Sequence, residues 1–247
     1  MSLKIGENLT KNYSINFDLP KRSKKVIHFI IIHYTGMRRE SDAIKRLCDS
    51  KSRVSAHYFV KNNGDVLNLV PDLYQAWHAG KSEWGNFKLI NKYSIGIEIS
   101  NPGHKNGYKN FTKKQIKAVK IILKLLIKKY NISYKNVLGH SDISPNRKLD
   151  PGEKFPWYEL SKKKMCLWHS LNNKKIKKFR DKKIGLNEKK IFIQNLYKIG
   201  YCKILGLKDQ NNIKKLTIAF QRRFRQEKIN GKIDMECLLI SKNLFKS

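Results

Sequence analysis

The chain has 247 residues, of which 40% are hydrophobic and 11% aromatic, enough for a substantial core. Lys and Arg outnumber Asp and Glu by 53 to 19, and this net charge of +34 predicts attraction to a polyanion such as cell wall, nucleic acid or anionic lipid. Only ten of the basic residues are arginines, which favour bidentate phosphate and guanine contacts, so the charge does not indicate specific nucleic-acid binding.

The four cysteines are at least 35 residues apart, which indicates neither a cysteine-based zinc site nor a disulfide framework. Residues 1–25 lack the apolar core of a secretory signal, and no apolar run reaches the roughly 20 residues of a transmembrane segment. We expect residues 1–25 to form an N-terminal arm on the domain surface.

The first strong pattern is the apolar, β-branched segment Val26–Thr35, which predicts a central strand buried on both faces. His28 and His33 differ by five positions, so in a strand they point to opposite faces and cannot share a metal. His33 is at the C-terminal end, where α/β sheets tend to hold ligands, whereas we interpret His28, in mid-strand, as structural.

Ser41–Cys48 predicts a short helix with Ser41 as its N-cap. Val54–Lys61 and Val66–Val70 flank an Asn- and Gly-containing turn and predict a β-hairpin. Within it, His57 is interpreted as a packed, hydrogen-bonded residue, because buried histidines usually find such partners.

The next segment, from Ala76 to Gly85, is predicted to be an aromatic, glycine-rich loop, and such loops often line clefts. Trp77 and His78 are therefore candidate substrate-binding residues, together with Tyr34 beside the first strand's histidine. The alternative for His78 is that it contacts a metal ligand rather than the substrate.

Tyr93–Ser100 alternates apolar and other residues, which predicts a strand with Glu98 on the face opposite its isoleucines. The alternative for Glu98 is the solvated face of an edge strand. Gly96, which leaves space beside this carboxylate, favours a cleft. Further on, Thr112 and Gln115 form a capping box before an amphipathic helix that we interpret as a packing element.

The loop Val137–Gly152 carries His140, Lys148 and Asp150. A His and an Asp ten residues apart are not a helical ligand pair, so the loop must bring them together. Because Pro151 biases its predecessor toward extended geometry, we expect Lys148 and Asp150 to face the same side. The alternative is an ordinary surface turn with a Lys–Asp pair.

The candidates combine into one constellation. His33, His140 and Asp150 would leave a zinc ion one open position, the pattern of a catalytic site. Glu98 could then carry protons, and Lys148 could stabilise an oxyanion. The chemistry indicated is hydrolysis of an amide or ester.

Three further ranges complete the expected domain organisation. Residues 26–171 form the catalytic domain, which ends with a short helix after Phe155. Residues 172–185 are basic and of low complexity, and we interpret them as a linker. Residues 186–247 predict a small bundle of three helices, the first capped by Asn187 and the third by Asp234, near the lower size limit for independent folding.

Five segments in order over Val26–Trp157 carry a family resemblance: I-I-H-Y-T, S-A-H-Y-F-V, A-W-H-A-G, Y-S-I-G-I-E-I-S-N and G-H-S-D-I-S-P-N-R-K-L-D-P-G-E-K-F-P-W. Together they resemble the zinc-dependent N-acetylmuramoyl-L-alanine amidases of the AmpD and AmiD type. The resemblance implies an α/β fold with a central mixed β-sheet flanked by helices, related to peptidoglycan recognition proteins.

The resemblance also implies site residues and a substrate. The family's zinc ligands fall on His33, His140 and Asp150, its catalytic glutamate on Glu98, and its lysine near the metal on Lys148. The substrate would be peptidoglycan or a muropeptide, cut between N-acetylmuramic acid, or its 1,6-anhydro form, and L-alanine. The alternative is a non-catalytic peptidoglycan-recognition protein, although such relatives typically lose a metal ligand.

The segments I-F-I-Q-N-L-Y-K-I-G-Y and A-F-Q-R-R-F-R are similar to peptidoglycan-binding helical domains that follow the catalytic domain in AmiD-type enzymes. This similarity favours a place in the periplasm or cell envelope, with cytoplasmic recycling as the alternative. Leu89 stands where relatives often carry an Arg thought to meet a stem-peptide carboxylate. We therefore expect a different peptide preference, or a substitute role for Lys88.

Overall fold

The computed structural model describes residues 12–203 and 209–246, and its centre is a five-stranded sheet. The strands of this sheet are β2 (Phe29–Tyr34), β3 (Tyr58–Val60), β4 (Val66–Asn68), β8 (Ser94–Ile99) and β9 (Val137–Gly139). Their spatial order is β4-β3-β8-β2-β9, and all neighbours are parallel except β4 at one edge. The expected α/β fold with a central mixed sheet is confirmed.

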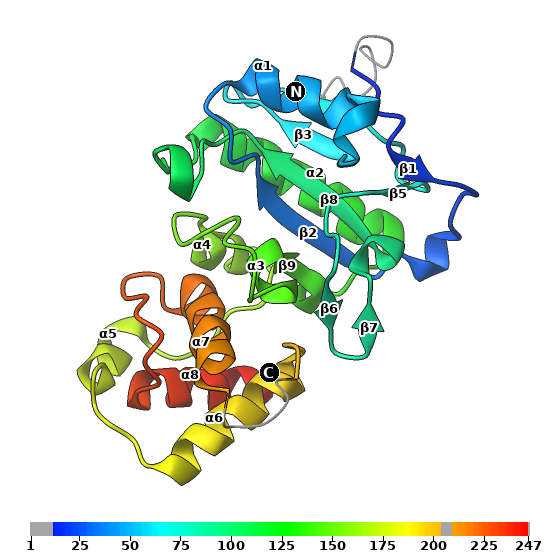
Figure 1. Ribbon diagram of the computed structural model, residues 1–247. Coiled ribbons are helices and arrows are strands. Elements are labelled where there is room, and N and C mark those ends of the chain that lie inside the picture. Colours follow the sequence, from blue (N-terminus) through cyan, green and yellow to red (C-terminus); the bar gives the residue numbers. More distant parts are fainter. Residues whose placement is uncertain (1–11, 204–208, 247) are drawn as a thin grey trace.

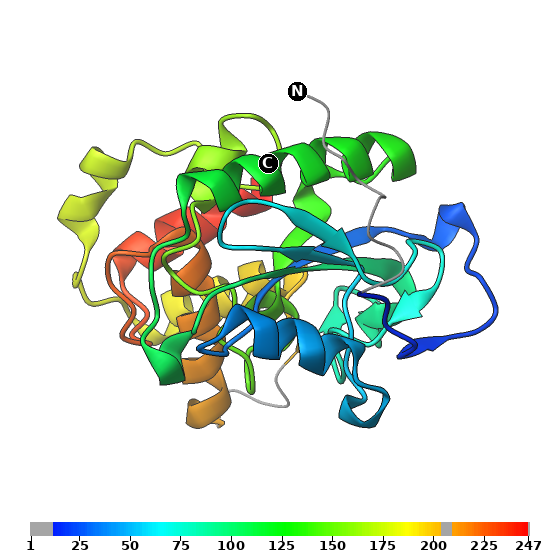
Figure 2. The same ribbon diagram turned by 90° about the horizontal axis from the view of Figure 1, so that it is seen from above.

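Helices cover both faces of the sheet (Figures 1 and 2). Helix α2 (Lys113–Tyr130) packs on the face that carries the even-numbered residues of β2 and the isoleucines of β8. Helix α1 (Glu40–Cys48) lies on the other face and packs Ala43 and Leu47 against Phe59 of β3. The capping box predicted at Thr112 is present at the start of α2.

The remaining elements are short, except for three C-terminal helices. The short strands are β1 (Phe17–Asp18), β5 (Gln75–Ala76), β6 (Glu83–Trp84) and β7 (Phe87–Lys88). The other α-helices are α3 (His140–Ile143), α4 (Trp157–Ser161), α5 (Asn173–Ile176), α6 (Leu186–Ile199), α7 (Gln210–Phe224) and α8 (Met235–Lys246). Single 3₁₀ turns occupy Lys24–Val26, Ser50–Ser52, Ile90–Tyr93, His104–Asn106, Tyr134–Asn136 and Lys177–Phe179. None of the described helices combines the length and apolar character that crossing a bilayer requires.

The C-terminal helices share a core with the sheet face opposite α2. Phe29 and Ile31 of β2 belong to the same buried cluster as Phe192 of α6 and Phe220 of α7. The stretch expected as a linker joins this cluster through Ile176 and contains α5. Figure 1 shows α6, α7 and α8 together below β9 and α3, so the C-terminal helices lie next to the helix that carries His140.

Part of the expected N-terminal arm, residues 1–11, lies outside the described residues. The remainder is tied to the domain, because β1 pairs with β5 and the Arg22 guanidinium donates to the carbonyls of Asp72, Tyr74, Asn91 and Ser94. Arg22 also lies 3.1 Å from His57 Nε2, so the arm contacts the amino-terminal ends of β3 and β8.

Four local predictions were wrong. Helix α1 begins at Glu40, one residue before the expected cap, and α6 begins at Leu186 with the Glu188 carboxylate reaching back to the Gly185 N–H. The predicted Ala76–Gly85 loop contains β6, which pairs with β7 as a hairpin around Gly85. His28 precedes β2 and packs against aromatic rings rather than lying in mid-strand.

Candidate metal centre and catalytic cleft

The candidate residues gather at the carboxyl ends of three adjacent parallel strands. Glu98 lies near the end of β8, His33 near the end of β2, and His140 directly after β9. His33 and Glu98 are paired in register, so both project from the face opposite α2. Because β8 lies between β3 and β2, Glu98 is on a central strand, and the edge-strand alternative is excluded.

Three of these side chains form a buried cluster. Asp150 Oδ2 lies 3.0 Å from the Nδ1 atoms of both His33 and His140, and the two Nδ1 atoms are 2.9 Å apart. The backbone also joins the two halves of the loop, since Ser141 N–H donates to the Asp150 carbonyl at 2.8 Å. Among the described residues, these three form the one group of His, Cys, Asp or Glu side chains arranged to hold a metal ion.

A chain of hydrogen bonds fixes the protonation of His33. The Ser94 hydroxyl donates to the Ile90 carbonyl at 2.7 Å, so Ser94 Oγ accepts from His78 Nε2 at 3.2 Å. His78 Nδ1 is then an acceptor, and His33 Nε2 donates to it at 3.1 Å. His33 therefore presents the lone pair of Nδ1 to the cluster.

The imidazole of His140 is also oriented by a hydrogen bond, so that its Nδ1 faces the cluster. Its Nε2 lies 3.0 Å from the Ala79 carbonyl, which can only accept, so Nε2 carries a proton and Nδ1 is the nitrogen that faces the cluster. The Arg147 guanidinium donates to the same carbonyl and to that of Lys81. Both histidines thus aim Nδ1, the nitrogen from which each could coordinate a bound cation, at Asp150.

The charges in the cluster suit a cation. Burial and the neighbouring His140 lower the pKa of His33 to about 4, so this imidazole is neutral at pH 7. Burial alone would raise the pKa of Asp150, but the two imidazoles hold it well below its ordinary value. One carboxylate and two imidazoles are among the donor sets that zinc takes in catalytic sites.

Glu98 is partly buried beside this cluster. Burial and the charge of Asp150 raise the pKa of Glu98 to about 8, while Lys148 acts in the opposite direction. Its Oε2 atom is buried and has no hydrogen-bond partner among the described residues. A cation held by His33 and Asp150 would lower this pKa, because a nearby opposite charge favours the carboxylate.

These residues open into one cavity of about 410 Å³. Its walls include Glu98, Lys148 and the candidate substrate contacts Tyr34, Trp77 and His78. Lys148 and Asp150 therefore face the same space, as their spacing predicts. Leu89 lines a neighbouring cavity of about 540 Å³, together with Lys88 and Arg147, and Arg147 borders both spaces.

Three residues of the site were missed by the sequence reasoning. Ser94 and Arg147 act through hydrogen bonds, and no spacing rule marks them. His104 lines the cavity and lies between the Tyr34 hydroxyl, 2.8 Å from Nδ1, and the Glu153 carboxylate, 3.1 Å from Nε2. Its position in the loop directly after β8 is the one signal that could have singled it out.

Comparisons with known proteins agree on one family. Residues 23–153 match the family described as N-acetylmuramoyl-L-alanine amidase. The N-acetylmuramoyl-L-alanine amidase AmiD of Escherichia coli K12 is 31% identical over 232 residues, which is 89% of this chain and 83% of AmiD. The 1,6-anhydro-N-acetylmuramyl-L-alanine amidase AmpD of the same strain is 37% identical over 105 residues, 42% of this chain and 55% of AmpD.

Solved structures extend the likeness to the C-terminal helices. The crystal structure of AmpDh3 from Pseudomonas aeruginosa superposes with a TM-score of 0.79 at 29% identity and covers 93% of this chain and 95% of its own. E. coli AmiD, solved with anhydro-N-acetylmuramic acid-L-Ala-D-gamma-Glu-L-Lys as substrate, has the same TM-score at 28% identity, with coverage of 93% and 92%.

Proposed function

The chain belongs to the family of N-acetylmuramoyl-L-alanine amidases, and from this premise we propose how its cleft hydrolyses the amide bond between N-acetylmuramic acid and L-alanine. His33, His140 and Asp150 bind one zinc ion. The observation that supports this most directly is the pair of imidazoles whose Nε2 atoms are held by other partners, so that both Nδ1 atoms face Asp150 Oδ2. A zinc ion held there polarises a carbonyl group and makes water more acidic.

Glu98 is the proton carrier of the reaction. It lines the cavity, is not within the ligand cluster, and has a buried oxygen without a hydrogen-bond partner. It accepts a proton from the attacking water and returns one to the amine of the leaving L-alanine. In the metal-free protein, burial and the charge of Asp150 raise its pKa to about 8.

Lys148 stabilises the charge that develops on the scissile carbonyl oxygen. Its side chain lines the cavity with Glu98 and Asp150, and it is near enough to affect the pKa of both Glu98 and His33. A fixed ammonium group contributes most where negative charge appears only in the transition state.

The substrate is peptidoglycan or a soluble muropeptide. Related AmiD and AmpDh3 structures hold anhydromuramyl peptides, which makes this chemistry a candidate substrate here. Tyr34 and Trp77 flank the cavity and supply surface for the sugar and the first amino acids. Residues 186–247 are proposed to bind polymeric peptidoglycan and so keep the cleft near its substrate.

The roles of the metal cluster and of Glu98 can be separated by one substitution. Glu98→Ala should keep one zinc per chain, because Glu98 is not a ligand, but lose at least two orders of magnitude in kcat on a muropeptide. Zinc content is measured by metal analysis after dialysis, and hydrolysis by mass spectrometry of the products. His33→Ala is the matched control and should lose both zinc and activity.

Full turnover of muropeptide by Glu98→Ala would remove Glu98 from the mechanism. Less than one zinc per chain in the folded wild-type protein would contradict the metal site itself. Running intact sacculi and anhydro-muropeptide side by side shows which of the two the enzyme prefers.

A further inference from the structure

The metal-ligand loop makes a buried contact with the C-terminal helices through Asp142. This residue lies two positions after His140 on the one-turn helix α3 and is 1% exposed. Gly139 N–H donates to its Oδ2 at 2.7 Å, and its other two hydrogen-bond partners are side chains from residues after 200. The carboxylate therefore joins the turn that carries His140 to the other part of the chain.

The two partners are Arg223 and Tyr201. The Arg223 guanidinium, on α7, donates to Asp142 Oδ2 at 2.9 Å, and the Tyr201 hydroxyl, after α6, donates to Oδ1 at 2.9 Å. Both side chains are 2% exposed. Asp142 thus receives two of its three hydrogen bonds from the C-terminal segment.

Arg223 also contacts the elements on either side of α3. It donates to the Val137 carbonyl at the start of β9 at 3.0 Å, and its guanidinium carbon lies 3.8 Å from the ring centroid of Trp157 in α4. The turn between β9 and α3 is tightly packed here, because a Cβ on Gly139 would come within 2.7 Å of Pro151. A shift of Asp142 would therefore be transmitted to His140.

We propose that Arg223 and Tyr201 are positioning residues for the metal ligand His140. They hold Asp142, and with it α3, in the orientation from which the His140 imidazole reaches the metal. This inference rests on the proposed zinc site. It assigns the C-terminal helices a part in building the active site, in addition to any contact they make with substrate.

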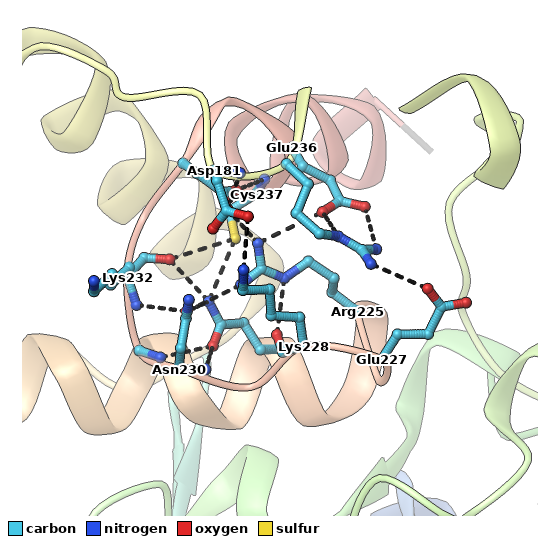
Figure 3. A network of polar contacts seen from close by, with 12 residues as sticks. Asp181, Arg225, Glu227, Lys228, Asn230, Lys232, Glu236 and Cys237 are labelled. Carbon is cyan, nitrogen blue, oxygen red and sulfur yellow. Dashed lines mark hydrogen bonds and ion pairs between the residues drawn. The ribbon is translucent and has the colours of Figure 1, made fainter. Parts of the chain in front are cut away.

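The chain offers a matched control for each residue. Arg225 follows Arg223 by two positions, is 3% exposed, and pairs with Asp234, which is 4% exposed. Figure 3 shows its network with Lys228 and Asn230, which extends to Asp181, and every residue labelled there lies at position 181 or later. Loss of Arg225 should destabilise the protein without moving α3.

For Tyr201 the control is Tyr130, which lies on α2. Its hydroxyl donates to the carboxylate of Asp72 at 2.7 Å, so Tyr130→Phe removes the same type of hydrogen bond from a buried aspartate. Neither residue lines the cavity of the candidate metal centre. Comparing the two Tyr→Phe variants separates a general loss of stability from an effect on the metal ligand.

The test is zinc affinity of the full-length apo-protein, measured by competition with a chromophoric chelator, alongside thermal unfolding in EDTA. Removing a direct hydrogen-bond partner of a metal ligand usually lowers affinity about 10- to 100-fold; because Arg223 acts through Asp142, Arg223→Met should lower zinc affinity about tenfold and Tyr201→Phe several-fold. Arg225→Met and Tyr130→Phe should lower the unfolding temperature yet leave zinc affinity within about twofold of wild type.

The possible failures are distinguishable. If wild type binds no zinc, the proposed metal site is wrong. If wild type binds zinc and Arg223→Met matches it within twofold, or if the Arg225 control loses as much affinity, the positioning role is refuted. Should Arg223→Met fail to fold, Tyr201→Phe decides: zinc affinity equal to that of Tyr130→Phe overturns the inference.

Discussion

Burial of the Glu98 carboxyl group opposes its ionisation, so the stability of the protein depends on pH. In the metal-free protein its pKa is raised from 4.5 to about 8. The folded state therefore binds a proton more tightly than the unfolded state, and stability from this group is present below pH 4.5 and lost as the pH rises through 8.

Glu98→Gln should remove this pH-dependent loss of stability, because the amide side chain stays neutral at every pH. In EDTA, the unfolding temperature of Glu98→Gln relative to wild type should rise by about 2–4 °C between pH 5 and pH 8.5, corresponding to about 1 kcal/mol for the partly exposed side chain. Differential scanning calorimetry at both pH values provides the measurement. A constant difference would mean that Glu98 is already ionised in the apo-protein.

Single residues also mark the limit of what the sequence could predict. The spacing of His33, Glu98, His140 and Asp150 was sufficient to group them, because strand alternation and loop breaks are local properties. The prediction that Gly96 leaves space beside Glu98 was correct, but the prediction that this space belongs to the cleft was wrong. A Cβ there would lie 2.4 Å from the His78 ring, so the space holds the histidine behind His33 rather than the cleft.

At the scale of elements, α2 is joined to the functional end of β8 through its first turn. Thr112 Oγ1 accepts from the Gln115 N–H at 3.1 Å, and the Gln115 side chain donates to the carbonyl of Ser100, directly after β8, at 2.7 Å. The cap therefore sets both the start of the helix and its attachment to the strand that carries Glu98.

Two substitutions distinguish these functions of the cap. Thr112→Ala should lower the free energy of unfolding by about 1 kcal/mol, the usual cost of losing an N-cap. Gln115→Leu should cost more, because it also leaves the buried Ser100 carbonyl without its donor. Urea denaturation measures both, and equal costs would show that the bond to β8 adds nothing.

Elements with strong local signals were predicted well, whereas those set by tertiary contacts were not. The capping box and periodicity of α2 are local, and so is the alternation of β8. The hairpin of β6 and β7 is two residues per strand, too short for an alternation to be visible. Its Trp84 packs edge-on against Tyr201, a contact between distant parts of the chain that no local pattern encodes.

For the whole molecule, the net charge of +34 should matter more for polymer binding than for catalysis. Stem-peptide carboxylates make intact sacculi polyanionic, and salt screens such long-range attraction, with a Debye length of about 10 Å at 0.1 M. Raising NaCl from about 50 to 500 mM should release the protein from sacculi, while kcat/KM on a small muropeptide changes less than about threefold.

Co-sedimentation with sacculi measures retention, and sacculi with chemically amidated carboxylates are the control. These should retain little protein even at low salt. If the amount of protein bound to sacculi changed with neither salt nor amidation, the charge would have no part in binding the wall.

The buried carboxylate of Asp142 limits how this enzyme can be re-engineered. A catalytic segment transplanted without Tyr201 and Arg223 would lose two of the three hydrogen bonds to the Asp142 carboxylate, including its ion pair with Arg223. Domain shuffling must therefore transfer both partners with it or replace Asp142 by a neutral side chain. For protein engineering, the catalytic segment and the C-terminal helices should therefore be transferred together.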